Sequence, residues 1–306
     1  MNTYEELRRQ ISGIVVPVPM IFTNDLGVDH AAISNYVQWC LDAGITNFCL
    51  TYGFSQVSTL TPDELMDVTE TIARTIGKRG IFIGCTIGNS IAETVVAVRQ
   101  MQAKGVDAVF VMPHIQCMGS AYCDYLNHVA ANTDLPLLFA NDPDYNDRTR
   151  ATIDGDDLKS LADVDQIIGL KDEMRSVLHR LSFNASFGDR FCVIGPGVRH
   201  FLVLFPHQAE LDGFFNPAEA VKFLKLIETD RLSDVLASLG AWMDSLRDRP
   251  AGVAGFAANQ VCLHALGFGQ GWQVRPPLVP ATEEQAKDII ARMRKHPGLY
   301  NLPSTR

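Results

Sequence analysis

The sequence lacks the cysteine spacing of a disulfide or zinc framework. Seven cysteines are spread over 306 residues, an odd number with no C-x-x-C pair among them. Most lie in apolar runs, where a thiol usually behaves as a small buried hydrophobic side chain. The seven are Cys40, Cys49, Cys85, Cys117, Cys123, Cys192 and Cys262. We therefore expect free thiols, which suits a reducing cytoplasm, and the histidines show no metal-ligand spacing either.

Positive charge is also scarce. The chain has 26 lysines and arginines against 35 acidic residues, for a formal net charge of −9. The acidic residues are scattered, so no basic surface is available to neutralise phosphates or anionic lipid. We therefore expect neither nucleic acid nor a membrane as a partner. An anionic substrate would have to be held by local donors, such as backbone N–H groups.

Long apolar runs are missing as well. No stretch approaches the length needed to span a membrane, and the first ten residues contain Glu5, Glu6, Arg8 and Arg9, unlike a signal peptide. Hydrophobic residues nevertheless make up 47% of the chain and charged residues only 20%. This composition predicts a compact, folded, cytoplasmic protein.

What the sequence does contain is an alternation of strand-like and helix-like segments. Asp29 precedes an apolar stripe of helical spacing, and two capping boxes, Thr61 with Glu64 and Ser90 with Glu93, open later helices. Short apolar runs lie between the helical segments, as expected for parallel strands joined by helical crossovers. The predicted strands are residues 14–18, 46–50, 81–85, 108–112, 135–140 and 167–170, with a weaker pair at 192–194 and 211–215.

Eight such strands favour an α/β fold of the closed (β/α)₈ (TIM) barrel type. A doubly wound sheet is the alternative, but no G-x-G-x-x-G follows the first strand, where Val16-Pro17-Val18-Pro19 stands instead. We expect the barrel to be a catalytic domain spanning residues 1–216, with a helical region at 217–306 packed on it. Its predicted helices are residues 218–228, 231–246, 254–266 and 282–295.

Lys171 is the first candidate for chemistry. It directly follows the predicted strand at residues 167–170, and catalytic groups of such barrels lie at the carboxyl ends of strands. A partly desolvated lysine can lose its proton and attack a carbonyl carbon. The alternative is a lysine that turns to solvent where the strand ends.

Several motifs resemble those of one enzyme family. Ile168-Gly169-Leu170-Lys171-Asp172 is similar to the G-[IL]-K-[DE] strand of the dihydrodipicolinate synthase and N-acetylneuraminate lyase family of class I aldolases. The resemblance covers nearly the whole chain. Its other matches, in chain order, are Pro19 to Asp29, Leu60-Thr61-Pro62-Asp63-Glu64, Met112-Pro113, Leu135-Pro136 with Asn141 and Pro143, and Arg275-Pro276-Pro277-Leu278.

The resemblance implies a (β/α)₈ barrel with trailing helices, usually a homo-oligomer and often a tetramer. It also implies that Lys171 forms an imine (Schiff base) with a small 2-oxo acid such as pyruvate, without a metal or other cofactor. The protonated imine acts as an electron sink for bond cleavage. That chemistry requires a fixed substrate carboxylate and a group that moves protons.

The family holds the carboxylate with a G-T-T-G-E turn after the second strand. This chain has Tyr52-Gly53-Phe54-Ser55-Gln56 there, so both threonines are replaced, by Gly53 and Phe54. Backbone N–H groups of such a turn can still bind a carboxylate, and Ser55 adds a hydroxyl. The alternative is a purely structural turn in which Phe54 packs.

The family's proton-relaying tyrosine is missing. Its Y-N-x-P motif reads Ala140-Asn141-Asp142-Pro143 here. The tyrosine pair after the fourth strand is replaced by His114-Ile115, and the family's substrate arginine aligns near Tyr145. We take His114 and Tyr52 as candidate acid/base groups and Asn141 and Tyr145 as candidate substrate contacts. Each of these can equally have a structural role, and Asp142 can be a base or a turn residue.

These departures resemble the dehydratases of 2-keto-3-deoxy sugar acids, which have Phe-Ser in the turn and lack the tyrosine. Phe54-Ser55, Ala140 and Gly195-Pro196 fit that branch. The leading hypothesis is a Schiff-base-forming lyase, an aldolase or dehydratase, for a small 2-oxo acid. The alternatives are dihydrodipicolinate synthase (4-hydroxy-tetrahydrodipicolinate synthase) and a non-catalytic 2-oxo-acid binder.

Overall fold

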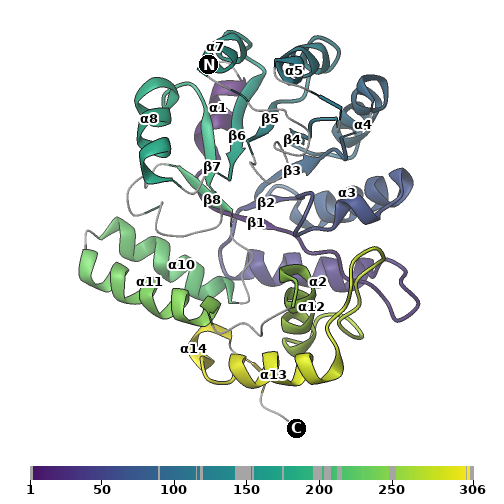
Figure 1. Ribbon diagram of the computed structural model, residues 1–306, viewed down its shortest axis with the longest axis vertical. Coiled ribbons are helices and arrows are strands. Elements are labelled where there is room, and N and C mark those ends of the chain that lie inside the picture. Colours follow the sequence, from purple (N-terminus) through teal and green to yellow (C-terminus); the bar gives the residue numbers. More distant parts are fainter. Residues whose placement is uncertain are drawn as a thin grey trace.

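Eight parallel strands close into a barrel in the computed structural model (Figure 1). β1 pairs with both β2 and β8, which closes the ring. This confirms the predicted (β/α)₈ fold. The strands are β1 (Gly13–Pro17), β2 (Asn47–Cys49), β3 (Ile81–Cys85), β4 (Ala108–Val111), β5 (Leu137–Asn141), β6 (Ile167–Asp172), β7 (Cys192–Gly195) and β8 (Ala209–Leu211). The structure describes residues 3–88, 90–114, 116–117, 120–141, 153, 155–173, 176–195, 202, 208–211, 216–229, 231–247, 253–300 and 302–303, with side chains from residue 4 and without those of 241–247.

Two predicted strands differ from the structure in ways that bear on the site. The strand predicted at 167–170 continues to Asp172, because Lys171 pairs with Ala140 of β5 and with Ile194 of β7. Lys171 is therefore part of the barrel wall. The strand predicted at 211–215 begins earlier, at Ala209, and residues 212–215 lie outside the described part of the chain.

Helices form where the capping residues predicted them. The Asp29 side chain accepts a hydrogen bond from the Ala32 N–H, and Thr61–Glu64 and Ser90–Glu93 both form complete capping boxes. The helices before β8 are α1 (Thr3–Gln10), α2 (His30–Asp42), α3 (Pro62–Ile76), α4 (Ile91–Ala103), α5 (Ala121–Ala131), α7 (Gly155–Ala162) and α8 (Val177–Phe187), with a short 3₁₀ turn, η1 (Val57–Thr59).

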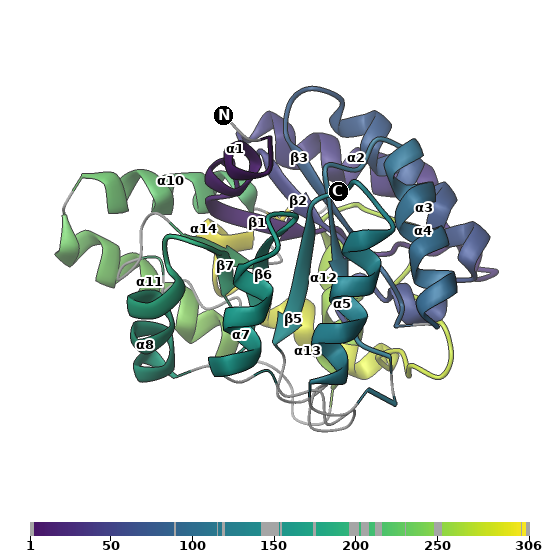
Figure 2. The ribbon, with the colours of Figure 1, turned by 90° about the horizontal axis from the view of Figure 1, so that it is seen from above.

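Helices alone follow β8 among the described residues. They are α10 (Pro217–Glu228), α11 (Leu232–Arg247), α12 (Gly255–Ala265), α13 (Glu283–Met293) and α14 (Pro297–Tyr300). α10 contacts β1 and α2, and in Figure 2 α10 and α11 lie on the side of the barrel opposite α3 and α4. The division of the chain at residue 216 stays a prediction. Among the helices that the structure describes, none is long and apolar enough to cross a membrane.

The strand register determines which side chains face the barrel interior. Paired residues on neighbouring parallel strands point to the same side, and successive residues alternate. Ala140, Lys171 and Ile194 form one such row, whereas Asn141 pairs with Asp172 on the opposite side. The first row lines the interior, and the second faces the layer of helices.

Candidate active site

Lys171 lies in the barrel interior near the carboxyl ends of the strands. Burial raises the pKa of the Cys85 thiol to about 12 and that of Cys49 well above its usual value, and the Lys171 charge opposes both shifts. Because these cysteines belong to β3 and β2, the lysine acts on them across the interior. Its side chain is 14% exposed. The buried thiols stay protonated at neutral pH, so they do not compete with the amine as nucleophiles.

Glu173 is the nearest acidic partner of Lys171 that the structure describes. It follows β6 directly, and its N–H donates to the Asn141 carbonyl oxygen at 2.9 Å. Its carboxylate forms an ion pair with the Lys171 amine, and its side chain is 15% exposed. A carboxylate held against an amine can accept its proton and return it. Sequence reasoning missed this residue, although an acidic residue two positions after Lys171 returns to the same side of an extended chain.

Ala140 is the interior neighbour of Lys171 on β5. The two residues are directly paired, and Ala140 is only 1% exposed. The position at which the family has its tyrosine therefore adjoins the amine, and here it offers only a methyl group. A methyl group cannot transfer a proton.

Asn141 points away from the interior. Its side-chain amide donates to the Asp172 carboxylate at 3.3 Å, on the side of β6 opposite Lys171. This geometry favours a role in a buried network behind the strand over direct contact with a substrate in the barrel.

The turn after β2 is held by hydrogen bonds of its own. The Thr51 N–H donates to the Ser55 hydroxyl oxygen at 3.0 Å, and the Ser55 N–H donates to the Thr51 hydroxyl oxygen at 3.2 Å. The Gln56 N–H donates to the Gly53 carbonyl oxygen at 2.9 Å. Ser55 is fully buried. Its hydroxyl oxygen and amide thus shape the turn, whereas Gly53 is exposed and an added Cβ there meets no atom within 4 Å.

Gln56, the last residue of this turn, has an unusual backbone conformation and a buried polar side chain. Its φ is 50°, in the left-handed region, and its side chain is 1% exposed. Neither atom of its amide has a hydrogen-bond partner among the described residues. An unsatisfied buried amide costs about 1–3 kcal/mol, so this side chain is expected to meet a water or a ligand. The only signal for Gln56 in the sequence is its alignment with the glutamate of the family motif.

The two candidate acid/base groups, His114 and Tyr52, belong to the segments that follow β4 and β2. Nδ1 of His114 accepts a hydrogen bond from the Gln116 N–H at 3.1 Å, and the His114 carbonyl oxygen accepts one from the Cys117 N–H at 2.8 Å. His114 thus stabilises the loop after β4. Tyr52 is half-buried and packs against the hydrophobic core. Tyr145, Asp142, Pro143, Ile115 and Pro196 lie outside the described residues.

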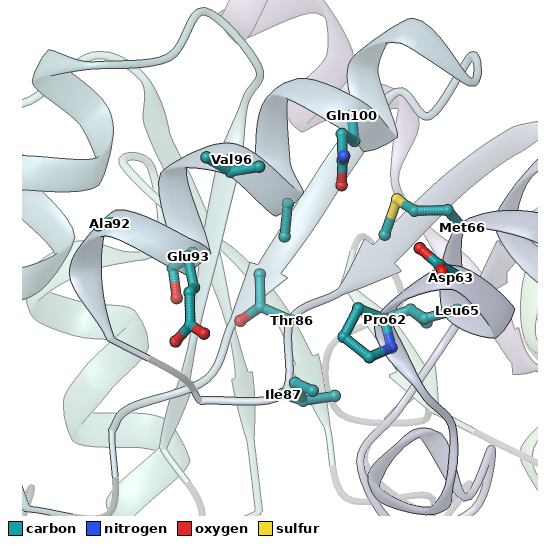
Figure 3. Close-up of a pocket in the computed structure, with 12 residues that line it drawn as sticks. Pro62, Asp63, Leu65, Met66, Thr86, Ile87, Ala92, Glu93, Val96 and Gln100 are labelled. Carbon is teal, nitrogen blue, oxygen red and sulfur yellow. The ribbon is translucent and has the colours of Figure 1, made fainter.

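A separate cavity of about 370 Å³ lies between α3 and α4. Side chains of the two helices face each other across it, with Thr86 and Ile87 between them (Figure 3). Its lining is mostly apolar and includes Leu65, Met66 and Val96. None of the lining residues belongs to the predicted site around Lys171.

The sequence model of the dihydrodipicolinate synthetase family matches residues 10–197. The chain belongs to this family. The match includes β1 to β7, and with them Lys171, Glu173 and the turn after β2.

Curated relatives carry two kinds of name. A protein of Rhizobium meliloti named "Probable 5-dehydro-4-deoxyglucarate dehydratase" is 24% identical over 302 residues, which cover 92% of this chain and 95% of the relative. A protein of the same name from Cereibacter sphaeroides is 26% identical over 279 residues, 87% and 89% of the two chains. A 4-hydroxy-tetrahydrodipicolinate synthase of Staphylococcus haemolyticus is 26% identical over 162 residues, 52% of this chain and 54% of the relative.

Solved structures agree with the fold. A prophage protein of the dihydrodipicolinic acid synthase family from E. coli K12, in complex with pyruvate, superposes with a TM-score of 0.82 at 21% identity, covering 94% of this chain and 99% of that one. Dihydrodipicolinate synthase of Aquifex aeolicus gives 0.81 at 20% identity, covering 97% and 100%. At these identities the likeness establishes the architecture.

Proposed function

We propose that this protein is a Schiff-base-forming lyase for a small 2-oxo acid, and specifically a dehydratase of a 2-keto-3-deoxy sugar acid. The observation that carries the proposal is the placement of the Lys171 amine in the barrel interior, in an ion pair with Glu173. Membership of the family supports an enzyme of the lyase type. The names of the relatives that align over most of their length support the dehydratase.

Imine formation requires that the amine loses a proton. In the proposed reaction Lys171 gives one proton to Glu173, and the neutral amine attacks C2 of the oxo acid. The C2 oxygen takes the second amine proton and becomes a hydroxyl group. Glu173 then returns its proton to that hydroxyl, water leaves, and a protonated imine remains. Within the turn after β2, the N–H groups of Gly53 and Phe54 are the proposed donors to the substrate carboxylate.

Dehydration uses the same carboxylate twice more. The protonated imine withdraws electrons from C3, so Glu173 removes a C3 proton and the bonding pair forms an enamine. The enamine then expels the C4 hydroxyl, which leaves as water with the proton from Glu173, and a C3–C4 double bond forms. No phenol is needed in this sequence, which is consistent with Ala140 beside the amine.

The synthase is the second candidate, supported by the relatives that carry that name over about half of the chain. It is less favoured because a methyl group stands where the family's tyrosine relays protons. The non-catalytic binder is the third candidate, and it predicts imine formation without release of any product. We keep the homo-oligomer, a tetramer by resemblance, within the proposal, and light scattering tests it.

The decisive experiment is to incubate the protein with pyruvate and sodium borohydride and to locate the adduct by mass spectrometry. We expect one reduced pyruvate adduct on Lys171 and none in Lys171→Ala. Lys104→Ala is the matched control, because Lys104 forms an ion pair with Glu70 on the outside of the barrel. If the wild-type protein gains no adduct at Lys171, the proposed function is wrong.

The choice among the candidates rests on product analysis. We expect a panel of 2-keto-3-deoxy sugar acids to give dehydrated products, and pyruvate with aspartate semialdehyde to give none. Turnover of the semialdehyde would favour the synthase. An adduct with every oxo acid but no product would favour the binder.

A further inference from the structure

A cluster of buried charges lies directly behind the catalytic strand. Arg180 of α8 is fully buried, as is Asp172, and the Glu210 side chain is 2% exposed. Nε of Arg180 lies 3.6 Å from the Asp172 carboxylate, and its Nη2 lies 3.7 Å from that of Glu210. The guanidinium thus links the end of β6 to β8. β7 lies between these two strands in the barrel.

Neutral side chains extend the cluster. Nη1 of Arg180 donates to the Gln208 side-chain oxygen at 2.7 Å, and the Gln208 amide donates to Asn184 of α8. On the other side, Asn141 of β5 donates to Asp172. The cluster therefore connects four structural elements, β5, β6, α8 and β8.

Gly195 makes room for this cluster on β7. A Cβ added at Gly195 would overlap the Glu210 carboxylate and the Arg180 guanidinium. The glycine is thus required by the approach of the charged groups, which lie against the strand backbone. Its position at the last residue of β7 places the cluster level with the strand ends.

The cluster and the amine occupy opposite sides of one strand. Lys171 and Asp172 are consecutive residues of β6, so fixing the Asp172 side chain on the outside also fixes the direction of the Lys171 side chain toward the interior. Attack on a carbonyl carbon depends steeply on such alignment, and a misplacement of about 1 Å can slow a reaction by about 100-fold.

We propose that Arg180 is a positioning residue for imine formation at Lys171: by binding Asp172 and Glu210 across Gly195, it fixes the end of β6. The inference rests on the proposed function of Lys171. It assigns Arg180 no contact with the substrate, because the guanidinium lies on the helix side of the sheet.

The test measures how fast pyruvate is trapped on Lys171 by borohydride as the pyruvate concentration varies. In Arg180→Met we expect the maximum rate to fall by about tenfold or more, the effect of a misplaced nucleophile. We expect the half-saturating pyruvate concentration to change by less than about threefold, because the turn after β2 is untouched. Arg180→Lys keeps the charge but loses the fork-shaped donor set. Its maximum trapping rate should therefore lie between that of the wild type and that of Arg180→Met.

Loss of stability must be separated from loss of position. Ile72→Ala removes a fully buried side chain from α3, distant from the cluster, and serves as the control of comparable destabilisation. Gly195→Ala disturbs the cluster from β7 while every charge is retained. We expect Gly195→Ala to slow trapping as Arg180→Met does, at a temperature where all variants are folded.

The outcomes distinguish the two proposals. An absence of adduct in the wild-type protein contradicts the function of Lys171 itself. If the wild-type protein forms the adduct, and Ile72→Ala, Arg180→Lys and Gly195→Ala form it equally fast, the positioning role is overturned. This holds even if Arg180→Met fails to fold. A slower maximum rate confined to the cluster variants supports it.

Discussion

The end of β6 and the turn after β2 contribute to the candidate site by different physical means. At β6, charged side chains hold one another: Lys171 pairs with Glu173 inside, and Asp172 with Arg180 outside. At β2, a serine and a threonine exchange hydrogen bonds with each other's backbone amides. The first arrangement can move protons, whereas the second can only orient donors. Reactivity should therefore depend on β6 and substrate affinity on the turn.

The largest expected effect is at β6. Glu173→Gln keeps the shape of the side chain but cannot accept a proton from Lys171 or from C3. We expect exchange of the pyruvate methyl hydrogens with deuterium, followed by nuclear magnetic resonance, to slow by about 100-fold. Glu173→Asp should recover part of the rate. Glu70→Gln is the matched control, because it breaks a lysine–glutamate pair on the outside of the barrel; unchanged exchange in Glu173→Gln would exclude the proton-transfer role.

A smaller effect is expected at the turn after β2. Ser55→Ala leaves the buried Thr51 N–H without its acceptor, which should lower the free energy of unfolding by about 1–3 kcal/mol. The half-saturating pyruvate concentration should rise more than the maximum trapping rate falls. Ser58→Ala, at an exposed position three residues on, is the control. A variant that loses maximum rate but keeps its affinity would contradict the division between the two regions.

The smallest effect concerns the ion pair between Arg275 and Glu64, next to η1. The Arg275 guanidinium donates to both oxygens of Glu64 at 2.7 and 2.8 Å, and also to the Thr59 carbonyl oxygen. The hydrogen bond from Arg275 is the main cause that lowers the pKa of Glu64 to about 2 from a usual value of 4.5. Because the folded pKa is the lower one, the pair stabilises the fold above pH 4.5, and this contribution is lost as the pH falls toward 2.

Urea unfolding of the wild type and of Glu64→Gln at two pH values measures the contribution of this ion pair to stability. The wild type should be the more stable protein at pH 7, by a small amount because Glu64 is about one third exposed. The difference should shrink at pH 3. A difference that stays constant between the two pH values would show that charge does not contribute.

The barrel was predictable because its elements are marked locally. Apolar runs, helical stripes and capping boxes such as Thr61–Glu64 act over a few residues, so they can be recognised in the sequence. The position of Lys171 near the carboxyl end of a strand was predictable for a related reason, since that strand carries a family motif. The extension of β6 through Lys171 was missed because pairing with Ala140 and Ile194 depends on neighbouring strands.

The surroundings of Lys171 could not be predicted in the same way. The ion pairs of Arg180 join residues that are far apart in the chain, since Glu210 lies 30 residues after Arg180 and 38 after Asp172. The reverse happened at Asn141, where a motif suggested a substrate contact but strand alternation turns the side chain outward. A motif identifies a position in the chain, whereas the strand register determines whether its side chain faces the barrel interior or the helices.

Ala140 also affects the size of the molecules that fit beside Lys171. A methyl group on β5 leaves the interior beside Lys171 wider than a phenol ring would leave it. A 2-oxo acid with a chain longer than that of pyruvate gains this width for its additional carbons and hydroxyl groups. We therefore expect the substitution that removes a proton carrier also to let the barrel admit larger substrates.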